Sequence, residues 1–192
     1  MKILLQTPRL VLRQFTSADA GLLVDLDADP RVMRYISNGV PTSLAEITDE
    51  YIPAYLGYHR AGPDFGFWVA QLRTTGEFAG WFHLRPEPGT PAAEPELGYR
   101  LTYTCWGRGL ATEGARALIN HGFSVPIVTR IHANTMAVNT ASRRVMEKCS
   151  MDLVRHFVAD WPVRIEGDEL GDVEYAITRA AWLAASSESP GA

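Results

Sequence analysis

A short glycine-bearing segment near the middle of this chain of 192 residues joins a strand-like run to a helix-like run. The segment reads Trp106-Gly107-Arg108-Gly109-Leu110-Ala111-Thr112. Residues 97–103 before it are rich in β-formers, and residues 113–123 after it are rich in helix formers. A glycine turn that opens a helix presents free backbone N–H groups at the positive end of the helix dipole. The chain therefore contains a β-α unit whose turn suits an anion, most often a phosphate.

This segment is similar to two familiar nucleotide-binding motifs, but in each comparison it lacks a residue that the motif requires. A dinucleotide fingerprint needs a third glycine where Thr112 stands, and an acidic residue in the region of residues 127–130, which has none. A triphosphate loop needs Lys-Ser/Thr where Ala115 and Arg116 stand. The segment alone leaves open a tight turn that binds nothing.

The composition excludes several classes of partner. With a formal net charge of −4, the chain has no basic excess for nucleic acid or an anionic membrane. No run approaches the roughly 20 apolar residues of a membrane span. The two cysteines, Cys105 and Cys149, form no Cys-x-x-Cys pair, so we expect a reduced, cytoplasmic protein. The five histidines are scattered without metal-ligand spacing, so we expect no metal.

The periodicity of the chain predicts a mixed α/β domain over residues 1–183, followed by a disordered tail at 184–192. Strands are expected at 10–15, 65–72, 77–84, 96–103, 128–134, 153–159 and 173–178. Helices are expected at 17–27, 43–60, 109–123 and 139–149, with a kink at Pro53. Residues 28–42 and 85–95 are expected as loops. Early hairpins followed by β-α-β units predict a mixed sheet with helices on both faces.

Four segments, in this order, resemble the GNAT acetyltransferases, and most closely the branch of the Rim ribosomal-protein N-terminal acetyltransferases. These segments are residues 7–13, 96–99 with 106–113, 139–148 and 172–182. The resemblance covers residues 7–182. It implies the GNAT fold, a mixed but mostly antiparallel sheet of about seven strands that is splayed in the middle.

The resemblance also implies an activity and its co-substrate. The activity is direct transfer of an acetyl group from acetyl-CoA to a primary amine, on a peptide N-terminus or a small molecule. Backbone groups near Leu101 would hold the pantetheine arm and polarise the thioester. The remaining CoA-binding residues implied are Trp106, Gly107, Arg108, Gly109, Leu110, Ala111, Thr112, Asn139 and Ser142.

Two side chains are predicted to be catalytic. Glu96 occupies the strand position where some GNAT enzymes carry a catalytic glutamate, so the resemblance implies that it is the general base. A carboxylate there would help to remove the proton that an amine carries at neutral pH. Its alternative is a solvated carboxylate paired with Arg100. Ser142 matches a family serine near the CoA sulfur, where it would protonate the leaving thiolate, and its alternative is an exposed helix serine. Asn139 is also a favoured helix N-cap. His83 is expected to be structural.

Some features of the sequence leave alternatives open. Met146 stands where many GNAT enzymes carry a tyrosine that acts as general acid, so a non-catalytic acyl-CoA-binding or sensing module is the second hypothesis. The donor could carry a succinyl or longer acyl group, and a homodimer is an alternative to a monomer. Acidic residues in 159–174 either attract a cationic acceptor or belong to a solvated hairpin.

Overall fold

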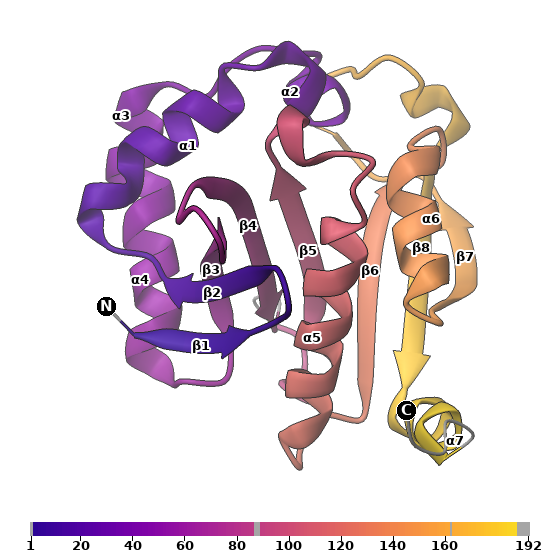
Figure 1. The fold of residues 1–192 in the computed structure, drawn as a ribbon. Coiled ribbons are helices and arrows are strands. Elements are labelled where there is room, and N and C mark those ends of the chain that lie inside the picture. Colours follow the sequence, from indigo (N-terminus) through magenta and orange to yellow (C-terminus); the bar gives the residue numbers. More distant parts are fainter. Residues whose placement is uncertain (1, 87–88, 162, 188–192) are drawn as a thin grey trace.

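The computed structural model describes residues 2–86, 89–161 and 163–187, and its centre is one eight-stranded sheet (Figure 1). The strand order is β1-β2-β3-β4-β5-β6-β8-β7. The strands are β1 (Ile3–Gln6), β2 (Leu10–Gln14), β3 (Gly66–Leu72), β4 (Phe78–Arg85), β5 (Glu96–Leu101), β6 (Arg130–Met136), β7 (Asp152–Phe157) and β8 (Asp172–Thr178). The helices are α1 (Ala20–Asp27), α2 (Pro30–Ser37), α3 (Leu44–Glu46), α4 (Ile52–Ala61), α5 (Leu110–Ser124), α6 (Thr140–Lys148) and α7 (Arg179–Ser187).

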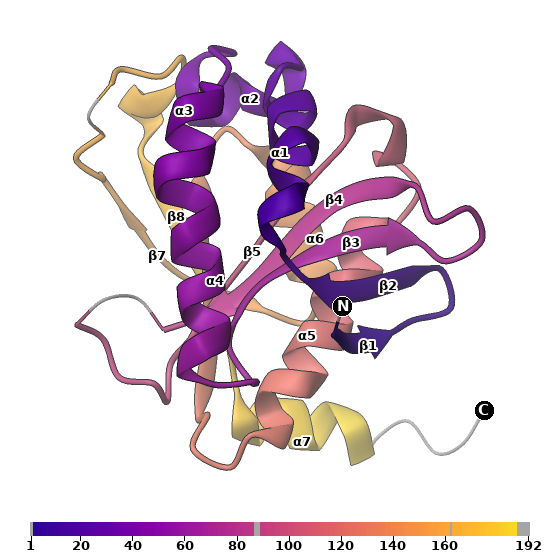
Figure 2. The same ribbon diagram turned by 90° about the vertical axis from the view of Figure 1, so that its left-hand side faces the viewer.

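Helices cover both faces of the sheet, as the sequence predicted. Neighbouring side chains of β3 point to opposite faces, so Trp68 joins the core under α5 and α6 while Phe67 and Val69 join the core under α1 to α4. Figure 2 shows α1 and α4 in front of the sheet, with β7 and β8 emerging beside α4. Two apolar cores therefore sandwich the strands and fix their positions from both sides.

The sheet is splayed between β5 and β6. These two parallel strands make one pair, Glu96 with His132, and no further register pair is recorded between them in the described part of the chain. By contrast, β4 pairs with β5 as far as Gly80 and Leu101. The strands meet at the N-terminal end of β5 and separate toward its C-terminal end, where the glycine turn begins (Figure 1). The predicted splay in the middle of the sheet is confirmed.

Three of the labelled strands and helices were not expected from the sequence: β1, α2 and α7. β1 adds an eighth strand, and its short run lacks the alternating pattern because it is an edge strand bonded only to β2. The expected loop at 28–42 contains α2. A proline usually ends a helix, which is why a loop was expected here. Pro30 instead stands in the first helical turn, where its missing backbone N–H costs nothing. The Asp29 carboxylate caps this helix by accepting from the Arg31 amide.

The C-terminal boundary also differs from the prediction. Helix α7 continues to Ser187, and Arg179 at its start donates to the carbonyl oxygens of Phe123, Val125 and Val128. Residues 184–187 of the expected tail are therefore helical. The rest of that tail, residues 188–192, lies outside the described residues.

The long helical segment before β3 is interrupted as Pro53 requires. A π-turn over Ile47–Tyr51 separates α3 from α4. A proline inside a helix has no N–H for the carbonyl four residues earlier and clashes with it. Widening the preceding turn relieves that clash, so the segment continues to Ala61 without leaving the surface of the sheet.

Gly114 sets the distance between α5 and the sheet, and this generates the first prediction. A Cβ at Gly114 would lie 2.6 Å from Cε1 of Phe82, a fully buried ring of β4. Gly114→Ala should lower the free energy of unfolding by about 1–3 kcal/mol through overpacking, measured by urea denaturation. The matched control is Gly21→Ala in α1, where an added Cβ would have no atom within 4 Å apart from its chain neighbours and the backbone of its own helix. It should be neutral or stabilising by up to about 1 kcal/mol, and equal losses for both variants would contradict the argument.

Candidate active site

The glycine turn after β5 has the geometry of an anion-binding helix start. Gly107 and Gly109 adopt positive φ angles of +68° and +76°, which other residues rarely tolerate. The first intrahelical bond of α5 runs from the Glu113 amide to the Gly109 carbonyl. The amides that precede Glu113 in this turn therefore have no intrahelical acceptor. They point out of the positive end of a helix of 15 residues.

The β1–β2 turn holds this helix start in place. Arg9 donates to the Arg108 carbonyl at 2.8 Å, and its Nε lies 2.6 Å from the Glu113 carboxylate. The Thr7 hydroxyl and the Arg9 amide also donate to Glu113. Burial alone would raise the pKa of Glu113, but these hydrogen bonds and the Arg9 charge hold the pKa below its usual value. The turn is thus a rigid cradle rather than a loose loop.

Trp106 closes the end of β5. Its indole Nε1 donates to the Leu101 carbonyl at 2.9 Å, and its ring packs against Tyr103 with 5.2 Å between centroids. The Leu101 side chain is buried in the core below α5. The structure therefore brings Leu101 and Trp106 together with the glycine turn. The indole N–H is bonded within the protein, while Trp106 as a whole remains 45% exposed.

Asn139, Ser142 and Tyr99 meet across the splay. Asn139 caps α6 by accepting from the Ser142 amide at 3.2 Å, so its predicted capping role is confirmed. The Ser142 hydroxyl lies 3.1 Å from the Tyr99 hydroxyl, which joins α6 to β5. Burial raises the pKa of Tyr99 strongly, against the smaller lowering effect of the Ser142 hydrogen bond. Tyr99 thus keeps its proton at any physiological pH.

Tyr99 is a functional candidate that the sequence reasoning missed. The sequence places Tyr99 only within the segment 96–99 of the resemblance. Alternation along the strand nevertheless puts it on the same face as Leu97 and Leu101, and this signal is readable from the sequence. Met146, at the position of the family's usual tyrosine, is 1% exposed and belongs to the core. A buried hydroxyl is therefore available beside Ser142 even though Met146 offers none.

Glu96 lies at the closed end of the splay, in a polar cluster. Its carboxylate is 2.9 Å from Nη2 of Arg85 and 3.5 Å from Nε2 of His83. Burial would raise the pKa of Glu96, but the hydrogen bond and charge of His83, then Arg85 and His132, hold it below its usual value. The alternative prediction, in which Glu96 pairs with Arg100, was wrong, because Arg100 pairs with the buried Asp27 at 2.6 Å.

Glu96 and the glycine turn stand at opposite ends of β5. Five steps along β5, at about 3.3 Å each, separate Glu96 from Leu101 by roughly 17 Å, and the turn follows beyond Leu101. A single extended molecule could reach from one to the other along the open edge of β5. Alternation places Glu96 on the face of α1 to α4, whereas Tyr99 faces α5 and α6.

An aromatic wall borders Glu96 on that face. Tyr55 of α4 stacks on Phe67 of β3 with 3.9 Å between centroids, and Phe67 lies 5.7 Å from Trp81 of β4. Tyr55 is 8% exposed, and burial raises its pKa. These rings pack against one another, so Tyr55 belongs to the core on this face of the sheet.

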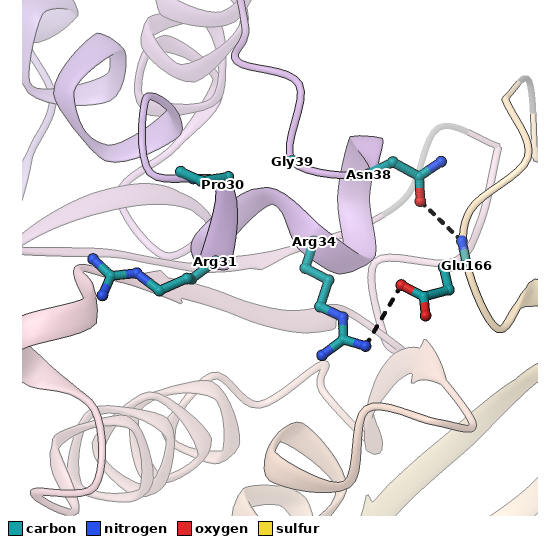
Figure 3. A pocket seen from close by; sticks show the side chains of 6 residues that line it. All are labelled: Pro30, Arg31, Arg34, Asn38, Gly39 and Glu166. Atoms are coloured by element: carbon teal, nitrogen blue, oxygen red, sulfur yellow. Dashed lines mark hydrogen bonds and ion pairs between the residues drawn. The ribbon is translucent and has the colours of Figure 1, made fainter.

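Two of the cavities in the structure are lined by charged side chains. One of about 510 Å³ is lined by Pro30, Arg31, Arg34, Asn38, Gly39 and Glu166, which Figure 3 shows around an opening between α2 and the β7–β8 connection. Asn38 accepts from the Glu166 amide, and Arg34 is 3.6 Å from the Glu166 carboxylate. The other, of about 320 Å³, is lined by Thr90, Pro91, Glu94, Arg130, His132, Arg155 and Glu174.

Several carboxylates of residues 159–174 are engaged within the fold. Asp168 accepts from the Ile165 amide and Asp172 from the Ala159 amide. Glu174 lies between Arg130 and Arg155 and is 6% exposed. Asp168 is paired with Arg164, and Glu174 with Arg130 and Arg155, so the charges of these two carboxylates are offset locally.

Within residues 2–86, 89–161 and 163–187, no three His, Cys, Asp or Glu side chains are grouped so that they could hold a metal ion. In the same ranges, no helix is both long and apolar enough to cross a membrane. Both cysteines are free and buried.

Comparison with known proteins agrees with this geometry. A family model described as "Acetyltransferase (GNAT) domain" matches residues 9–152. The "FsC-acetyl coenzyme A-N(2)-transacetylase" of Aspergillus fumigatus is 34% identical over 188 residues, 93% of this chain and 77% of that protein. RimL, a ribosomal L7/L12 alpha-N-protein acetyltransferase solved with coenzyme A, superposes with a TM-score of 0.76 at 18% identity, over 94% of this chain and 99% of its own. A GNAT-family acetyltransferase from Bacillus anthracis gives 0.73 at 24% identity, over 93% and 99%.

The fold and the site define an N-acetyltransferase that uses acetyl-CoA as co-substrate and acetylates an amine. The chain belongs to the GNAT acetyltransferase family. The predicted family, fold, activity and co-substrate are thereby confirmed, and the non-catalytic alternative is not favoured. The likeness to RimL, at 18% identity, is a likeness of fold, so membership of the Rim-like branch stays a prediction.

The lowered pKa of Glu96 generates a prediction about stability. A carboxyl whose folded pKa is depressed stabilises the protein above its unfolded pKa and loses this contribution as pH falls through the folded value. Glu96→Gln should therefore be less stable than wild type at pH 7, and the gap should close toward pH 3. Urea unfolding at both pH values measures it. A gap of equal size at pH 7 and pH 3 would show that the carboxylate charge contributes nothing.

Proposed function

We propose that this chain transfers the acetyl group directly from acetyl-CoA to a primary amine in the splay between β5 and β6. The observation that carries this proposal is the single β5–β6 pair, Glu96 with His132, with the glycine turn at the opposite end of β5. A sheet that opens in this way leaves backbone groups of β5 without a neighbouring strand. An extended pantetheine arm can then add to that edge.

The residues of the turn suit the pyrophosphate of CoA. Amides from Arg108 to Thr112 would bind it through the backbone, with no cationic side chain needed. Trp106 and Gly107 shape this turn, and the Leu101 backbone would hold the pantetheine. Asn139 sits at the N-terminus of α6 on the other side of the splay. The proposed CoA site is thus built from two helix starts and one free strand edge.

Proton handling divides between the two faces of the sheet. Glu96 would remove the proton of the incoming ammonium, directly or through water. The amine nitrogen attacks the thioester carbonyl, the carbon–sulfur bond breaks, and the thiolate takes a proton. Ser142, hydrogen bonded to Tyr99, would supply that proton, and the pair would regain it from the nitrogen as the amide forms. One proton of the ammonium thus ends on the thiol and the other reaches solvent.

We favour a small-molecule acceptor over a peptide N-terminus. The relative that is 34% identical over 93% of this chain is named for transfer to an N(2) position of FsC. RimL, named for α-N-protein acetylation, shares only 18% identity. We also propose a cytoplasmic location, because both cysteines are reduced. The homodimer stays an alternative that sedimentation analysis would decide.

Gly109→Val should weaken CoA binding. A β-branched side chain cannot adopt the φ angle of +76° without strain, and the turn amides would lose their arrangement. We expect at least a ten-fold higher Kd for CoA by calorimetry. The matched control is Gly76→Val, at φ +74° in the β3–β4 turn with no atom within 4 Å. This control carries the same strain, so equal affinity losses in both variants would remove the turn from the CoA site.

Glu96→Gln should lower kcat by roughly 10²-fold, the usual size of a general-base contribution. The Kd for CoA should barely change, because the turn lies at the other end of β5. Steady-state kinetics with a thiol reagent and calorimetry with CoA measure the two quantities. A variant with wild-type kcat would place the base elsewhere.

The acceptor class is tested by a screen of amines at fixed acetyl-CoA. FsC, small primary amines and peptides with a free N-terminus are compared by kcat/KM, with thiol release and acetylated product both measured. We expect small amines to exceed peptides at least ten-fold. Preference for peptides would reverse the acceptor assignment, and thiol release without acetylated product would indicate hydrolysis alone.

A further inference from the structure

His83 occupies a fixed place over β5, beside the predicted base. It stands in β4 opposite Gly98 of β5. A Cβ at Gly98 would lie 2.5 Å from Nε2 of His83, so only glycine allows the imidazole to rest on the β5 backbone. The ring stacks on Trp81 at 5.7 Å and meets Phe67 edge-on at 4.7 Å. The side chain is 7% exposed, and its position is set by packing on three sides.

The partner of this imidazole is the Glu96 carboxylate. Nε2 of His83 and Oε2 of Glu96 are 3.5 Å apart, within ion-pair range. Arg85 binds the same carboxylate oxygen at 2.9 Å. Glu96 is therefore held in one orientation, with His83 as its neighbour on β4. A carboxylate in this position stabilises a protonated imidazole.

Glu96 alone is a weak final acceptor for an amine proton. Despite its burial, the hydrogen bond with His83 and the surrounding positive charges hold its pKa below the usual value. A base is most effective when its pKa lies near the working pH. Histidine is the side-chain type that changes charge closest to neutral pH, so an imidazole in contact with the Glu96 carboxylate is a chemically suitable second acceptor.

We propose that His83 receives the amine proton through Glu96, so that the two side chains form the proton-accepting pair of this enzyme. The inference rests on the proposed function and deepens it. The ammonium proton moves to the Glu96 carboxylate and on to the His83 imidazole, which becomes imidazolium and releases the proton to solvent after transfer. The other bond changes are unaltered: the nitrogen attacks the thioester carbonyl, the carbon–sulfur bond breaks, and the thiolate takes its proton from Ser142. His83 acts through Glu96 and is a positioning and relay residue.

Other titratable and charged groups surround the pair and would tune it. They are Arg85 of β4, Arg100 of β5, His132 of β6, and Tyr55 and Tyr58 of α4. Arg100 is neutralised by Asp27, and Arg85 binds Glu96 directly. Both arginines are therefore paired with carboxylates, and the groups near Glu96 that can change charge close to neutral pH are the histidines His83 and His132.

The test compares pH profiles of kcat for wild type, His83→Gln and Gly98→Ala with one acceptor. His83→Gln removes the imidazole, and Gly98→Ala displaces it while leaving both partners in the chain. We expect each variant to lose at least ten-fold in kcat at pH 7. The acidic limb should move at least one pH unit lower, because a lone carboxylate then sets it. His121→Gln is the control, since His121 lies on α5 and bonds to the Asp64 carbonyl. It should keep the wild-type profile.

Thermal melting and CoA affinity test whether each variant is folded. If His83→Gln does not fold, Gly98→Ala provides an independent test of the relay. A wild-type profile in His83→Gln would overturn the inference, and so would a lower kcat with an unmoved acidic limb, because a purely structural role has that signature. An inert wild type would overturn the proposed function as well. Active wild type with an unaltered His83→Gln would overturn only the relay.

Discussion

The single pairing of β5 with β6 is the constraint on which the rest of this molecule depends. A parallel sheet normally continues its hydrogen bonds along both strands, but here the ladder stops after Glu96 and His132. On its other side each strand has an extensive antiparallel partner, β4 for β5 and β8 for β6, so the two halves of the sheet are joined mainly at the Glu96–His132 pair.

The open end of the splay is fixed by packing rather than by the turn alone. Gly114 lets α5 approach Phe82 closely, and the contacts of Arg9 and Thr7 with Glu113 tie the helix start to the first hairpin. A flexible glycine loop would pay a large ordering entropy on binding a phosphate. A turn that is held on two sides is already ordered, which leaves more of the interaction energy for affinity.

Alternation along β5 separates the two halves of the chemistry. Glu96 and Gly98 face α1 to α4, where His83 and Arg85 surround the carboxylate, whereas Tyr99 faces α6 and meets Ser142. A group that removes a proton and a group that donates one need different surroundings. Here the neighbouring charged side chains hold the pKa of Glu96 below its usual value, whereas burial raises the pKa of Tyr99. One strand supplies both surroundings, since neighbouring residues emerge on opposite faces of the sheet.

The sequence alone determined the β-turn-α unit, the mixed sheet with two covered faces and the residues of the glycine turn, because these depend on local periodicity and backbone conformation. It also pointed to Glu96, Asn139 and Ser142 through the resemblance. Only the tertiary structure decided that Arg100 binds Asp27, that Arg85 and His83 hold Glu96, and that Tyr99 meets Ser142. Those pairs join elements far apart in the chain. Periodicity shows which face a side chain occupies but cannot say which distant side chain it will meet there.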